Sequence, residues 1–114
     1  LSTHVLDTAA GLPARGVRIE VHRVDDAGRV AVAAAVTNAD GRTDAPLLEG
    51  DRLEPGVYEL TFFVAEYFRR TGAVLPTPPF LDAIVLRVGL SDAGGRYHVP
   101  LLVSPYGYST YRGS

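Results

Sequence analysis

Apolar and polar residues alternate in short runs along most of this chain, and glycine or proline separates one run from the next. The clearest run covers residues 15–24, in which Val17, Ile19 and Val21 point to one side of an extended backbone. The 12 glycines and 8 prolines are spread between the runs and do not gather in one linker. This pattern is typical of an all-β domain built from short strands.

The same alternation predicts the remaining strands. Further strands are expected over residues 3–6, 30–36, 56–64, 82–88 and 97–103. One poorly patterned strand before Pro55 and one at the C-terminus bring the total to about seven or eight. The residues expected to share a face are Val30, Val32, Ala34 and Val36 in one strand, and Tyr58, Leu60, Phe62 and Val64, as a buried set, in another.

One short helix is expected over residues 65–70, because Thr71-Gly72 and the prolines that follow cannot continue it. Two antiparallel sheets of this size can cover each other's apolar faces. We therefore expect an antiparallel β-sandwich, with a single domain spanning residues 1–114 of this 12.2 kDa chain.

Composition excludes several classes of function. The chain has no cysteine, which removes disulfides, thiolate metal sites and thiol nucleophiles. A net charge of −2 and a pI near 5.9 give no basic face for nucleic acid. No apolar stretch reaches the roughly 20 residues of a membrane span, and no secretory signal is visible. We expect a cytoplasmic protein whose true N-terminus lies upstream of Leu1, since the sequence contains no Met.

Three histidines are candidates for chemistry. His22 alternates with charged residues and is expected on a solvent face. His98 must point outward beside Pro100, which belongs at a sheet edge or a bulge. The bland interpretation of His98 is a histidine in a covered interface, and the functional one is a ligand site. His4 lies in a short first strand.

Other types of site find little support. Zinc requires three or four ligands, and only His4 and His98, with Asp7 and the C-terminal carboxylate as distant candidates, could cooperate, so no metal is expected. There is no GxSxG motif for a serine nucleophile. Turns or chain ends explain all five serines: Ser2, Ser91, Ser104, Ser109 and Ser114.

Arg42 follows an Asp40-Gly41 turn, a position where a guanidinium often binds anions. The C-terminal residues 106–114 are rich in tyrosine up to the end, where most chains are polar and disordered. Aromatic ends of this kind are usually docked, and Tyr with Arg suits a flat polar ring.

Three motifs together resemble the transthyretin superfamily. His4-Val5-Leu6-Asp7 with Gly11-Leu12-Pro13-Ala14 resembles its first signature, and residues 97–109, Tyr-His-Val-Pro-Leu-Leu-Val-Ser-Pro-Tyr-Gly-Tyr-Ser, resemble its second. The final Tyr111-Arg112-Gly113-Ser114 resembles the terminal tetrapeptide of the enzyme branch, the 5-hydroxyisourate hydrolases. The hormone carriers of the superfamily have Lys in place of His4 and Thr in place of His98. The resemblance covers essentially the whole chain.

The resemblance implies a homotetramer of β-sandwiches, with active sites at the interface between dimers. It implies hydrolysis of 5-hydroxyisourate to 2-oxo-4-hydroxy-4-carboxy-5-ureidoimidazoline in urate degradation, without metal or cofactor. The residues implied as catalytic are His4, Arg42, His98 and Ser114, and those implied as substrate-binding are His4, Arg42, Tyr111, Arg112 and Gly113. Two alternatives stay open: a carrier that binds a small aromatic ligand without turnover, and a structural domain of a larger chain.

Overall fold

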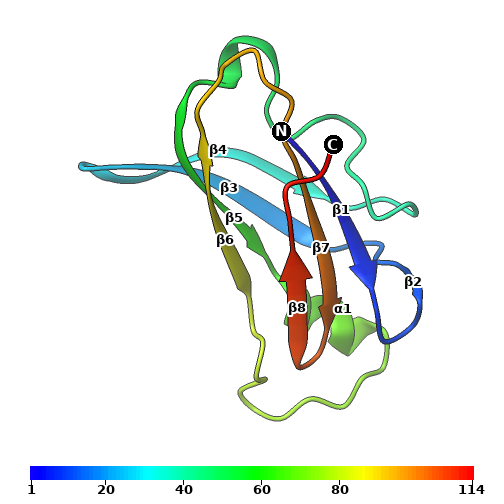
Figure 1. Ribbon diagram of the computed structural model, residues 1–114. Coiled ribbons are helices and arrows are strands. Elements are labelled where there is room, and N and C mark those ends of the chain that lie inside the picture. Colours follow the sequence, from blue (N-terminus) through cyan, green and yellow to red (C-terminus); the bar gives the residue numbers. More distant parts are fainter.

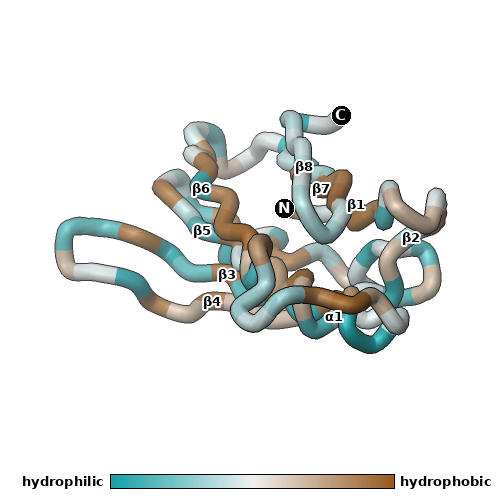
Figure 2. The backbone as a smooth tube through the Cα atoms, turned by 90° about the horizontal axis from the view of Figure 1, so that it is seen from below, coloured by the Kyte–Doolittle hydropathy of each residue, from teal (hydrophilic) through white to brown (hydrophobic).

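A computed structural model describes all 114 residues and consists of two four-stranded sheets packed face to face (Figure 1). One sheet has the order β2-β1-β7-β8 and the other has the order β4-β3-β5-β6. Figure 2 shows the two layers edge-on. The strands are β1 Ser2–Asp7, β2 Leu12–Pro13, β3 Arg18–Asp25, β4 Gly28–Val36, β5 Gly56–Phe62, β6 Ile84–Leu90, β7 His98–Ser104 and β8 Gly107–Thr110. The all-β sandwich expected from the sequence is confirmed.

The core lies between the sheets and comes from alternate residues of the facing strands. Twenty-two buried residues form one apolar cluster. The predicted residues Tyr58, Leu60 and Phe62 of β5 are at most 1% exposed. Val64, predicted in the same strand, is also buried but begins the helix that follows. Alternation predicts these positions well because each strand buries one face and leaves the other free.

The helix α1 covers Val64–Arg70, one residue more than predicted, and packs at one end of the sandwich (Figure 1). Its Tyr67 donates a hydrogen bond of 2.8 Å to Oδ2 of the buried Asp7. Burial and this bond raise the pKa of Tyr67 to about 12. None of the helices is long and apolar enough to span a lipid bilayer.

One pair of strands is parallel, and it joins the two ends of the sequence. β1 runs beside β7 with Ser2 opposite His98 and His4 opposite Pro100. All other strand pairs are antiparallel. The parallel register brings the first residues of the chain next to its last strand, as the neighbouring termini in Figure 1 show.

One expectation about strand positions is wrong, and one observed strand was outside the predicted set. Residues before Pro55 form no strand, because Gly50–Arg52 is a 3₁₀ helix whose first residue has a φ of +58°. The two-residue strand β2 was not expected, since a pair of residues carries no periodic pattern.

The shared face expected in β4 is also wrong. Val21 pairs with Ala33 but His22 pairs with Ala31, so Val32 is an extra residue in a β-bulge. The bulge interrupts the alternation. Val32, Ala33 and Ala35 pack against the core, whereas Val30 and Val36 are 61% and 57% exposed.

Pro100 lies in a central strand and not at an edge. The carbonyl of His98 accepts a hydrogen bond from Gly113 N and therefore points toward the C-terminal segment. Because the backbone groups of successive residues point to opposite sides of a strand, those of every second residue counted from His98 face this segment. Pro100 lies on that side, after β8 has ended at Thr110 and before the bridge at Gly113. Its missing N–H therefore falls in a gap of the ladder, and Thr110 Oγ1 bonds its carbonyl at 2.7 Å.

Candidate active site

His4 and His98 leave the same face of the β2-β1-β7-β8 sheet, on the side away from the core. In the parallel register, His4 lies opposite Pro100 and Ser2 lies opposite His98. Their chain neighbours Thr3, Val5 and Val99 are buried in the core. Both imidazoles are half-buried. The sheet thus presents two histidines on an accessible surface from adjacent strands.

A tight turn brings Arg42 to the same place. Gly41 has a φ of +74°, and its carbonyl accepts a 2.7 Å hydrogen bond from Val5 N, next to His4. A side chain at position 41 would place Cβ 2.3 Å from the carbonyl oxygen of Val5, so only glycine fits. Asn38 Oδ1 accepts hydrogen bonds from the N–H groups of Asp40 and Arg42 and closes the turn. Arg42 therefore extends from a fixed backbone beside His4.

The surroundings of His98 favour its neutral form. Burial lowers the pKa of His98, and the positive charges of Arg42 and His4 lower it further. Arg42 takes part in none of the five ion pairs of the structure. An uncharged imidazole beside an unpaired guanidinium can accept a proton while the cation stabilises negative charge.

The C-terminal tetrapeptide packs directly against His98. Gly113 N donates a 2.7 Å hydrogen bond to the His98 carbonyl. A Cβ on Gly113 would lie 2.6 Å from His98 Cδ2, so the absence of a side chain lets the tail approach the ring. Ser114 lines a hollow of about 610 Å³ together with His98 and Ser2.

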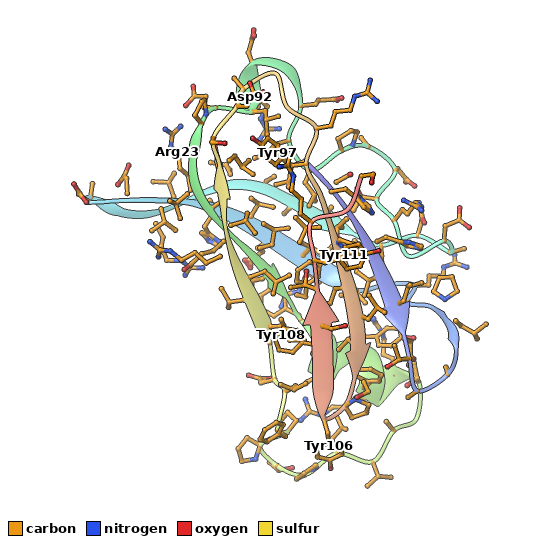
Figure 3. All side chains as sticks on the ribbon, viewed as in Figure 1. Arg23, Asp92, Tyr97, Tyr106, Tyr108 and Tyr111 are labelled. Carbon is orange, nitrogen blue, oxygen red and sulfur yellow. The ribbon has the colours of Figure 1, made fainter.

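Tyr111 and Arg112 lie on the other side of His98. Together with His98 and β6 they line a groove of about 430 Å³. The Arg112 guanidinium lies 4.6 Å from the centre of the Tyr97 ring and donates to the Arg96 carbonyl at 3.3 Å. The Tyr111 ring is 62% exposed beside β8 (Figure 3). The tail is thus docked, with its two largest side chains along the groove.

Two other residues considered from the sequence lie elsewhere. His22 is on the outer face of the opposite sheet, where its Nδ1 contacts Arg29 at 3.3 Å. Asp7 points into the interior and accepts hydrogen bonds from Tyr67 and the backbone of Ala9 and Ala10. No group of three His, Cys, Asp or Glu side chains is arranged to hold a metal ion.

Sequence reasoning missed two residues of this region. The sequence pattern explains Ser2 only as a residue of the chain end, but it belongs to β1, and its Oγ lies 2.8 Å from His98 Nδ1. Tyr97 was expected only in the core, yet its ring also supports Arg112 and its hydroxyl accepts a hydrogen bond from Asp92 N (Figure 3). No local pattern marks Ser2, because its partner lies 96 residues away.

Comparison with known proteins identifies the family. The HIUase/Transthyretin family matches residues 1–113. The chain belongs to this family. The HIUase/transthyretin fold places both sequence signatures and the C-terminal tetrapeptide around the face that carries His4 and His98.

Individual relatives cover the whole chain. A protein of Deinococcus radiodurans named 5-hydroxyisourate hydrolase is 57% identical over 114 residues, which is all of this chain and 95% of that protein. The solved structure of (S)-allantoin synthase has a TM-score of 0.93 and 47% identity, and the match covers 99% of this chain and 42% of that one. The 5-hydroxyisourate hydrolase of Klebsiella pneumoniae has a TM-score of 0.81 and 34% identity, with 99% and 97% covered.

Proposed function

We propose that this chain hydrolyses 5-hydroxyisourate to 2-oxo-4-hydroxy-4-carboxy-5-ureidoimidazoline, a step of urate degradation. The observation that carries the proposal is the environment of His98. Its ring contacts Ser2 and Gly113, and the charges of Arg42 and His4 help to lower its pKa. Full-length relatives with the name 5-hydroxyisourate hydrolase support it.

The reaction opens the six-membered ring at a lactam C–N bond. Water attacks the carbonyl carbon and gives a proton to a neutral imidazole of the His4–His98 pair. The oxyanion that forms is stabilised by the guanidinium of Arg42, which has no carboxylate partner. The C–N bond then breaks, and the imidazolium returns its proton to the leaving nitrogen.

The C-terminal tetrapeptide completes the pocket in this proposal. Gly113 holds the tail against His98 through its backbone. Tyr111 and Arg112 contact the planar substrate from the groove, and Ser114 lies near the attacking water from the adjoining hollow. The Tyr97 ring already restricts Arg112 before the substrate binds. The tail therefore loses less conformational entropy on binding.

The substrate is a small molecule, and the family to which the chain belongs includes oligomeric carriers and enzymes. We further propose a homotetramer. The edge strands β6 and β8 lie on either side of the same groove, and both leave one row of backbone groups unpaired. A second copy can pair with these edges, and light scattering after size-exclusion chromatography tests the assembly. A monomer at micromolar concentration would contradict it.

One assay tests the activity and separates it from ligand binding alone. The protein is mixed with freshly generated 5-hydroxyisourate, and the decay of ultraviolet absorbance is compared with the spontaneous rate. A hydrolase accelerates the decay with multiple turnovers. A carrier that binds a small aromatic ligand without chemistry, or a structural domain, leaves the rate of decay unchanged.

A further inference from the structure

Ser2 makes the one side-chain hydrogen bond to the His98 ring. The distance from Ser2 Oγ to His98 Nδ1 is 2.8 Å. The backbone fixes this contact, because Ser2 N donates to the Tyr97 carbonyl at 2.9 Å and the parallel register places Ser2 opposite His98. Both side chains therefore leave the same face of adjacent strands.

The His98 ring is held at both edges next to its attachment point. Nδ1 and Cδ2 are the two ring atoms bonded to Cγ. Ser2 contacts the first, and Gly113 lies against the second, so closely that a Cβ there would be 2.6 Å away. The ring is thus placed between β1 and the C-terminal tail, while Nε2 and Cε1 are the atoms farthest from the backbone.

This arrangement decides which nitrogen can exchange a proton with a substrate. The bond to Ser2 occupies Nδ1 whichever partner donates, so Nε2 is the nitrogen that stays free. A ring turned over by 180° about the Cβ–Cγ bond would place a carbon against the Ser2 hydroxyl and lose the bond. The hydroxyl therefore selects one ring orientation.

On the basis of the hydrolase function proposed above, we propose that Ser2 is a positioning residue. It accepts a hydrogen bond from Nδ1–H of His98 and leaves an unprotonated Nε2 facing the substrate. A hydroxyl adds no charge, in contrast to a carboxylate in the same place, which would favour the imidazolium. Ser2 thus orients the base without making it cationic at rest.

The charged and titratable groups around His98 come from several elements. They are His4 of β1, Arg42 of the turn, Arg87 of β6, Glu49 near the 3₁₀ helix, the N-terminal ammonium of Leu1, Arg96, Tyr97, Tyr111 and Arg112 near β7 and the tail, and the terminal carboxylate of Ser114. None of them forms a hydrogen bond with the His98 ring, which leaves Ser2 as the group that distinguishes Nδ1 from Nε2.

The first experiment reads the tautomer without any turnover. In ¹⁵N NMR of the wild-type protein above the pKa of His98, with the signal assigned through His98→Gln, we expect a protonated Nδ1 and an unprotonated Nε2. In Ser2→Ala, the signals should move toward a mixture of the two tautomers. A proton on Nε2 in the wild type, or an unchanged tautomer in Ser2→Ala, would overturn the proposal.

The second experiment measures the effect on catalysis. Ser2→Ala should lower kcat about three- to tenfold, the factor expected for one ordinary hydrogen bond, with little change in KM. Ser2→Thr keeps the hydroxyl and should restore the rate. Thr3→Val is the matched control, because Thr3 bonds the Val99 carbonyl from the core face of the same strand. It should lower the melting temperature and leave the His98 tautomer unchanged.

The outcomes separate the two proposals. If the wild type shows no turnover but the tautomer depends on Ser2, the hydrolase function fails and the positioning of His98 stands as a structural property. If the wild type turns over and Ser2→Ala matches it in kcat, tautomer and pH dependence, the role of Ser2 fails and the hydrolase function remains.

Discussion

The outer faces of the two sheets differ in how their charges are balanced. On the β4-β3-β5-β6 sheet, Arg18 pairs with Glu66 at 3.0 Å and Glu59 pairs with both Arg29 and Arg87. On the β2-β1-β7-β8 sheet, the two histidines and the nearby Arg42 have no carboxylate partner. Balanced charges form an ordinary solvated surface. An unpaired cation beside a half-buried imidazole is instead available to a ligand.

His22 and His98, which lie on opposite outer faces, show the same contrast. His22 contacts Arg29 on the balanced face. His98 is bound by Ser2 at one edge and covered by Gly113 at the other. Orientation does not separate them, since both side chains point away from the core. Their neighbours across the sheet do, and the predictions below test this difference.

The largest effect is expected from removing the tail. Deletion of residues 111–114 should reduce turnover to the spontaneous rate, because it removes Gly113 from His98 and Arg112 from the groove. The fold should persist, since the core cluster contains none of these residues. Circular dichroism and the decay assay check both points. Full activity in the truncated protein would assign the tail a structural role only.

Loss of the His98 imidazole or the Arg42 guanidinium should lower kcat nearly as much as loss of the tail. His98→Ala and Arg42→Ala are each expected to lower kcat about a hundredfold or more, the scale of one acid–base or oxyanion group. Arg29→Ala on the balanced face is the control for loss of a guanidinium, because Arg29 pairs with Glu59 away from the groove. Near-native kcat in both site variants would remove these residues from the mechanism.

A smaller loss is expected from crowding His98. Gly113→Ala places a methyl group against Cδ2, so the ring or the tail must shift, and kcat should fall about tenfold. Gly107→Ala is the matched control, because its nearest neighbour would be Ser104 Oγ at 3.9 Å. Equal kinetics for the two variants would show that the contact has no part in catalysis.

The smallest effect is expected on the opposite sheet. His22→Ala should change kcat and KM by less than about twofold, because surface substitutions away from special contacts have small effects. Steady-state kinetics beside His98→Ala checks this directly. A comparable loss in the two variants would contradict the distinction between the faces.

The sequence alone predicted the strands in which alternate residues pack in the core. β3, β5, β6 and β7 were found because one face of each packs in the core. The shared face in β4 was missed because a bulge at Val32 breaks the period. The edge position of Pro100 was wrong because the ladder gap that tolerates it depends on where β8 ends.

Part of the candidate site was also predicted, but from sequence motifs and a turn and not from alternating burial. His4, His98 and the last four residues lie in motifs that resemble the family, and Arg42 follows a predicted turn. The structure brings His4, Arg42, His98 and Gly113 together. Ser2 was missed because it depends on a parallel pairing between the two ends of the chain. Local patterns carry no information on such a register.

Titration of His98 tests the central claim most directly, because the mechanism requires a neutral imidazole beside Arg42. Since the pKa of His98 is lowered on folding, the unfolded chain binds more protons, and this group's contribution to stability is present above about pH 6.5 and lost as the pH falls. NMR should give a His98 midpoint below 6.5, with the acid limb of kcat/KM at the same pH. A midpoint at or above 6.5, or an acid limb that does not follow it, would contradict the account.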